Sequence, residues 1–161
     1  MDQNDNDILI SITPSLSRRV LGAGTIAALG VLLISLVFDM QGLWSLAFLV
    51  MGLLTLLAAA RLWNATNDKL ELTRTELRTA SGRVLTEVAN IRSVDRGAFA
   101  FKPSNGFLVK LEEPRGASWA PGLWWQRGRL LGVGGVLRGG EARAMAEMIT
   151  ALKNGTLDLL K

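Results

Sequence analysis

One long block that is almost free of charge constrains this chain more than any other feature. From Val20 to Ala60 the only ionisable residue is Asp39. It separates two apolar runs, Val20–Phe38 and Leu43–Leu62, of about 19 and 20 residues. An α-helix rises ~1.5 Å per residue, so each run is long enough to cross a hydrocarbon core of ~30 Å. Because backbone polar groups in lipid must be satisfied within each segment, the block predicts a transmembrane hairpin of two helices.

Residues suited to the membrane–water interface flank the two runs. Trp44 and Trp63 are about 19 positions apart, or ~28 Å along a helix, which matches the separation of the two interfacial belts. Basic residues lie at the end of the hairpin where the chain enters and leaves it, which we call the foot. The connection between the two helices, which we call the tip, carries only Asp39. The positive-inside rule then predicts a two-span membrane protein with both termini in the cytoplasm. The predicted interface anchors are Arg18, Arg19, Trp44, Arg61 and Trp63.

The composition removes several classes of enzyme. The chain has no Cys, His or Tyr, which excludes thiol nucleophiles, disulfides, zinc sites of the usual Cys/His kind and imidazole bases. We therefore predict no catalytic residue, no cofactor and no metal, and a function that is not enzymatic. The alternative is an enzyme that acts on a lipid-borne substrate with Asp, Glu or Lys chemistry.

The N-terminal segment, residues 1–17, begins with aspartates among Asn and Gln and then becomes apolar. Ile8–Ile12 is a short β-prone run that ends ahead of Pro14. Two interpretations stay open for this run. It either adds an edge strand to the C-terminal domain or lies at the membrane surface.

The pattern of residues 64–161 predicts a small β domain with a C-terminal helix. Short alternating runs such as Leu70–Thr73 and Val84–Val88 are separated by turn residues, which is typical of antiparallel strands. The last element differs, because Ala142, Met145 and Leu152 recur at helical spacing. We expect this amphipathic helix to cover the sheet.

This order of elements resembles that of the bacterial pleckstrin-homology-like (PH-like) domains, many of which have one or two N-terminal membrane helices. The resemblance covers roughly residues 68–153 and the hairpin at 18–63. It implies a partly open barrel of about seven strands capped by a C-terminal helix. It also implies a membrane-bound adaptor, here of the bacterial inner (plasma) membrane, and the family has no shared catalytic residue. The residues that carry it are Leu70-Glu71-Leu72-Thr73, Leu77, Gly82, Ile91 and Val94.

The most distinctive stretch of the domain is rich in Phe, Trp and Arg. Three of the five Trp fall between Trp119 and Trp125, and five Arg stand against one Glu between Arg115 and Arg143. Trp beside Arg suits a lipid interface and equally suits a protein–protein interface, and the third possibility is that the Trp are core residues. The predicted binding surface comprises Phe99, Phe101, Phe107, Arg115, Trp119, Trp124, Trp125, Arg127 and Arg129.

Two other binding functions are disfavoured. The glycines in Leu131–Val136 lack the dinucleotide-binding spacing, and no strand follows the last helix to complete a βαβ unit. The net charge is only +4 and the basic residues form no dense cluster, so we expect no nucleic acid. The predicted partners are the lipid bilayer and a membrane protein. The oligomeric state stays open.

Overall fold

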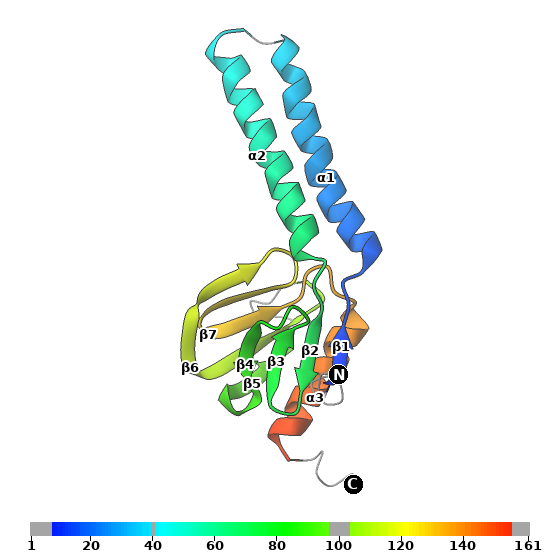
Figure 1. The fold of residues 1–161 in the computed structure, drawn as a ribbon, viewed down its shortest axis with the longest axis vertical. Coiled ribbons are helices and arrows are strands. Elements are labelled where there is room, and N and C mark those ends of the chain that lie inside the picture. The colour runs from blue at the N-terminus through cyan, green and yellow to red at the C-terminus, as the bar shows by residue number, and fades with distance from the viewer. Residues whose placement is uncertain (1–7, 40, 97–103, 156–161) are drawn as a thin grey trace.

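A long helical hairpin stands on a β-rich domain (Figure 1). The structure, a computed structural model, describes residues 8–39, 41–96 and 104–155. The hairpin consists of α1 (Leu16–Ser35), the short 3-10 helix η2 (Leu36–Asp39) and α2 (Leu43–Ala65). Both arms are long and apolar enough to span a membrane. This agrees with the predicted two-span hairpin, although α1 begins ahead of the apolar run, directly after Ser15.

The two helices approach each other through small residues. The buried positions of the arms are Ala23, Gly30, Gly52 and Ala59. A Cβ on Gly52 would lie 3.0 Å from the backbone oxygen of Gly30, and one on Gly30 would lie 3.2 Å from that of Gly52. Close backbone contact of this kind is how helices associate in lipid, where apolar side chains gain nothing by leaving the tails.

The first sheet of the domain begins before the hairpin. Its strand order is β1-β2-β3-β4, and all pairs are antiparallel. β1 pairs with β2 in the register Ile12 to Leu70 and Ser11 to Glu71. Of the two interpretations of Ile8–Ile12, the edge strand is the one observed. The hairpin therefore lies within the β domain's sequence and not ahead of it. The bounds are β1 (Ile8–Ile12), β2 (Leu70–Thr73), β3 (Glu76–Thr79) and β4 (Val84–Glu87).

The second sheet, ordered β5-β6-β7, is dominated by a bent ribbon. Between the pairs Lys110–Leu130 and Arg115–Gly128, β6 advances five positions while β7 moves only two. The extra residues lengthen the outer path, as a bulge does, so the ribbon curves with β7 on the inside (Figure 1). The bounds are β5 (Ile91–Asp95), β6 (Phe107–Ala120) and β7 (Trp124–Val133), with the 3-10 helix η3 (Val88–Asn90) before β5.

The core lies between the two sheets and the last helix, α3 (Gly139–Lys153). α3 buries Ala142, Met145 and Ile149, which matches the predicted amphipathic helix. Sequence analysis expected a partly open barrel of about seven strands. Seven strands are described, counting β1, and they form two antiparallel sheets of four and three strands without closing into a barrel.

One end of the domain faces the hairpin. The β3–β4 turn lies beside the foot of α2, where the Ala80 amide donates to the Lys69 oxygen over 2.9 Å. The β6–β7 turn reaches the same place, because a Cβ on Gly122 would lie 2.9 Å from Leu62 Cδ1 and 3.1 Å from Thr66 Cγ2. We call this end, made of residues 66–69, 80–84 and 119–123, the hairpin-side rim. Since β4 runs away from it, Glu87 and η3 lie at the far end.

Candidate functional site

Arg19 ties the two ends of the hairpin together. Its guanidinium donates to Thr66 Oγ1 over 3.0 Å, to the Trp63 carbonyl over 3.3 Å and to the side-chain oxygen of Asn67. It also lies 4.6 Å from the centroid of the Trp63 ring. Arg19 was predicted as a membrane anchor. The structure places it at the foot, with its donors directed at α2 and the residues that follow it.

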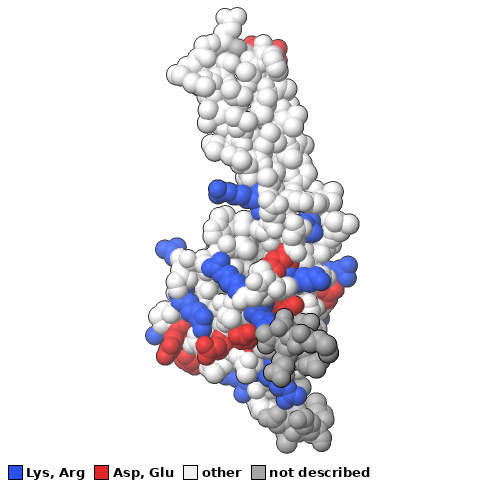
Figure 2. All heavy atoms as spheres, viewed as in Figure 1, with Lys and Arg blue, Asp and Glu red and all other residues white. Residues whose placement is uncertain are grey.

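The other predicted anchors are open to the surroundings. Arg18 and Arg61 are exposed at the foot and form no hydrogen bond or ion pair with the described residues. Trp63 is exposed beside them, and Trp44 is exposed at the opposite end of α2. Figure 2 shows a shaft without charged atoms between acidic atoms at the tip and basic atoms at the foot. This is the distribution that the sequence predicted.

Two residues of the predicted binding surface are core residues instead. Phe107 and Trp124 are almost completely buried. Phe107 opens β6 opposite Val133, where the ribbon packs toward α3, and Trp124 is covered by Arg83, whose guanidinium lies 5.1 Å from its ring. The prediction for these two was wrong because a domain of this size needs large aromatic side chains to fill its core.

The remaining two tryptophans of the cluster form a cross-strand pair. Trp119 on β6 stands opposite Trp125 on β7, next to the pair Ala120–Trp124. Trp125 is half-buried, because its indole lies over Gly132, where any side chain would collide with it. Trp119 is 70% exposed. Of the three clustered Trp, only Trp119 is fully available to a ligand.

The three predicted arginines lie around the bend of the ribbon. Arg115 reaches Glu87 on β4 with 3.6 Å between the charged groups. Arg127 and Arg129 are exposed on either side of Gly128 and form no ion pair with the described residues. These two cations are free to meet an anionic partner. The remaining predicted residues, Phe99 and Phe101, lie outside the described residues.

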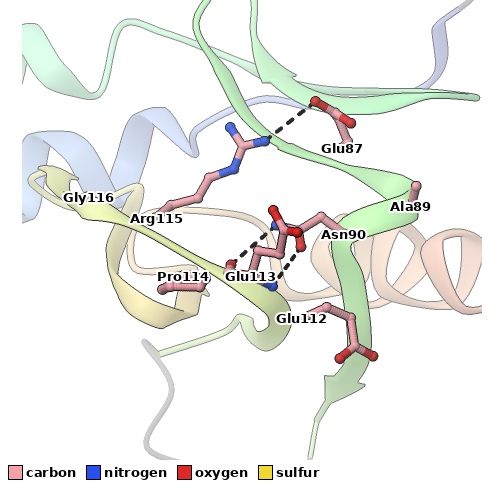
Figure 3. Close-up of a pocket in the computed structure, with 8 residues that line it drawn as sticks. All are labelled: Glu87, Ala89, Asn90, Glu112, Glu113, Pro114, Arg115 and Gly116. Carbon is pink, nitrogen blue, oxygen red and sulfur yellow. Dashed lines mark hydrogen bonds and ion pairs between the residues drawn. The ribbon is translucent and has the colours of Figure 1, made fainter.

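A cleft of about 670 Å³ opens at the far end of the domain (Figure 3). Asn90 clamps the bulge of β6 there: its Oδ1 accepts the Glu113 amide over 2.8 Å, and its Nδ2 donates to the Glu113 carbonyl over 3.4 Å. Arg115 and Glu87 bridge one side of the cleft, and the Glu112 and Glu113 side chains point away from each other (Figure 3). The two glutamates are therefore not a carboxylate pair, as their adjacency predicted.

Several side chains that hold segments of the fold together could not be recognised from the sequence. Thr66 and Gln126 are buried polar side chains that accept from Arg19 and donate to the Leu85 carbonyl, respectively. Asn90 and Arg83 look like ordinary surface residues. Their roles depend on which strands the fold brings together. Only Gly122, in a Pro-Gly turn, carried a local hint, and its φ of 78° is one that favours glycine.

Comparison with protein-family models, with curated proteins and with solved structures finds no match. The function of this chain is therefore inferred from its own residues.

Proposed function

We propose that this chain is a membrane-anchored, non-enzymatic accessory or adaptor protein. Its domain is PH-like and binds a membrane-protein partner or lipid headgroups. Six strands after the hairpin, completed to seven by β1 ahead of it, and one closing helix support the PH-like assignment, because about seven strands capped by a C-terminal helix are what the resemblance implies. The exposed Trp119 and the free arginines of the ribbon support a binding role.

The position of the hairpin carries this proposal. It connects β1 to β2, which are paired neighbours in one sheet, so the domain is attached to the hairpin by two chain segments. Arg19 fastens one segment to the other, and the Ser15 amide donates to the Val136 carbonyl over 2.8 Å. A domain held in this way keeps one orientation to the bilayer. This suits a protein that presents a fixed surface to a neighbour in the membrane.

The same connection supports a single-sided topology. β1 and α3 belong to one domain, so the segments at both ends of the chain lie on one side of the hairpin. Basic residues at the foot support the proposal that this side faces the cytoplasm at a bacterial inner membrane. A fluorescent protein that folds only in the cytoplasm, fused after Lys161, is expected to fluoresce. A fused alkaline phosphatase, which is active only outside, is expected to stay inactive.

The partner is tested by affinity purification of the full chain from detergent-solubilised membranes. The wild-type chain is expected to recover a companion in a fixed ratio. The variant Arg127→Glu with Arg129→Glu should lose it, because the reversed charges repel what the arginines bind.

The matched control is Arg92→Glu with Arg143→Glu, which reverses two exposed arginines on β5 and α3. Loss of the companion in the ribbon variant alone supports the proposal. Equal loss in both variants would show that net charge, not this surface, holds the companion. Recovery of no companion, with no binding to anionic lipid, would contradict the proposal.

A further inference from the structure

Among the described residues of the β domain, the most exposed large apolar side chain lies on the hairpin-side rim. Among the described residues outside the hairpin, only Val84, Trp119 and Leu130 are large apolar side chains exposed by more than about a third, and Trp119 is the most exposed. Val84 and Trp119 both belong to the rim. A soluble domain normally buries its Trp or uses it at an interface.

The rim lies beside the end of α2 at which the candidate membrane span ends. A Cβ on Gly122 would lie 2.9 Å from Leu62 Cδ1 and 3.1 Å from Thr66 Cγ2, so the β6–β7 turn lies close to the end of α2 that carries Trp63. Trp119 is three residues from Gly122, or at most ~10 Å along a strand. In Figure 1 this part of β6 lies just beneath the foot of α2. The β3–β4 turn is adjacent, because Arg83 of that turn covers Trp124.

Basic residues are concentrated at the end of the domain that faces the hairpin. The segments at the foot and on the rim carry five basic residues and one acidic residue, Asp68. The Asp68 carboxylate accepts from Ser81 Oγ over 2.6 Å, so its acceptor capacity is partly used within the rim. The cleft at the far end is lined by three acidic residues, Glu87, Glu112 and Glu113, and by one basic residue, Arg115, which pairs with Glu87. The five basic residues are Arg18, Arg19, Arg61, Lys69 and Arg83.

From these observations we propose that the hairpin-side rim rests on an anionic lipid bilayer, with the Trp119 indole among the headgroups and Val84 beside it. The inference rests on the proposed function, because it requires the hairpin to span the membrane. The occupant is lipid because the rim continues the foot of the hairpin, and because aromatic side chains and cations together suit the headgroup layer. A partner protein would then bind elsewhere, at the bend that carries Arg127 and Arg129.

The test uses two single-cysteine variants of the full chain, which has no Cys of its own. Trp119→Cys places an environment-sensitive NBD label on the rim, and Ala89→Cys places it on exposed η3 at the far end. Each is reconstituted at one chain per nanodisc of phosphatidylcholine with phosphatidylglycerol, so that no second copy can shield the label. Iodide quenching is expected to be at least about threefold weaker at position 119 than at position 89, because interfacial groups sit ~5–10 Å deep.

Equal quenching at the two positions would overturn this inference. Alkaline extraction of the chain from vesicles of the same lipids is measured alongside. If the chain is extracted, the proposed membrane anchor has failed. If the chain stays in the vesicles while position 119 is quenched like position 89, the anchor stands and only the docking of the rim is refuted. Protection at 119 in a chain that resists extraction supports both.

Discussion

The hairpin and the β domain differ in the kind of side chain that each buries. In the hairpin the buried positions are Gly or Ala, while leucines along both helices face outward. In the domain most of the buried apolar side chains are large, namely Leu, Ile, Val, Phe, Trp and Met, and the surface is polar apart from a few residues. One chain thus follows two opposite packing rules. The boundary between the rules lies at Arg19 and Thr66, which is where the proposed membrane anchor would leave the lipid.

The exceptions to each rule are informative. Trp119 breaks the rule of the domain, since it is exposed where a soluble protein would bury it, and it does so at the end nearest the hairpin. Arg19 breaks the rule of the hairpin, since it is a charged side chain whose donors are satisfied within the protein. Both exceptions lie where the hairpin meets the β domain, a region that we call the joint. The joint is therefore the part of the molecule to test.

The largest expected effect compares one leucine from each region. Leu77→Ala removes a fully buried side chain from the core and should lower the free energy of unfolding by about 3 kcal/mol, because it leaves a cavity. Leu57→Ala removes a side chain that is 59% exposed on α2, and it should cost less than about 1 kcal/mol in a detergent micelle.

Both variants are compared with the wild-type chain by chemical unfolding in the same micelles, followed by circular dichroism. Equal losses would mean that Leu57 packs against protein, as in an oligomer of hairpins. That outcome would contradict the conclusion that large apolar side chains face outward in the hairpin and inward in the domain.

The second expected effect concerns the centre of the hairpin. A Cβ on Gly52 would lie 2.5 Å from Ile34 Cγ1 and 3.2 Å from its backbone nitrogen, so Gly52→Val must push the helices apart. We expect a loss of about 2 kcal/mol of stability. Gly24→Val is the control, because a Cβ there meets nothing within 4 Å and both changes replace a helical glycine by the same residue. The measurement is the SDS fraction at which the helices separate in mixed micelles, and similar values for both variants would contradict the observed packing.

The sequence predicts those helices and strands that are determined by a pattern of neighbouring residues. The hairpin follows from a charge-free block, and α3 follows from apolar residues at helical spacing. For Ile8–Ile12, the local β propensity indicates a strand but does not identify its partner. That partner is β2, which follows the whole hairpin in the sequence.

The candidate site was predictable only in part, for the same reason. Trp119, Trp124 and Trp125 share one composition signal, yet strand alternation directs Trp124 inward, and Gly132 receives Trp125. The bulge of β6 sets which residues face out, and its position depends on a pairing with β7 that no local pattern records. The sequence therefore located the cluster but could not tell the exposed tryptophan from the buried one.

The third effect tests the joint itself with two neighbouring arginines. Arg19→Ala removes the donors to Thr66, Trp63 and Asn67, and it should cost about 1.5 kcal/mol, because the acceptors lose a charged partner. Arg18→Ala should change stability little, since that side chain is exposed. Hydrogen–deuterium exchange in micelles is expected to speed up in the Arg19 variant at residues 66–70. Identical exchange in both variants would show that the two chain crossings alone hold the domain.

The smallest effect concerns the bend of β6 at the far end of the domain, where polar side chains hold the backbone as small residues hold the hairpin. Asn90→Ala removes both contacts to Glu113 and should cost about 1 kcal/mol, because the bulge has no strand partner to replace them. Glu87→Gln weakens a solvent-exposed ion pair with Arg115 and should cost less than about 0.5 kcal/mol. Thermal unfolding of the two variants ranks them. A larger loss for Glu87→Gln would mean that charge, and not the amide clamp on the backbone, keeps the ribbon bent and its tip against α2.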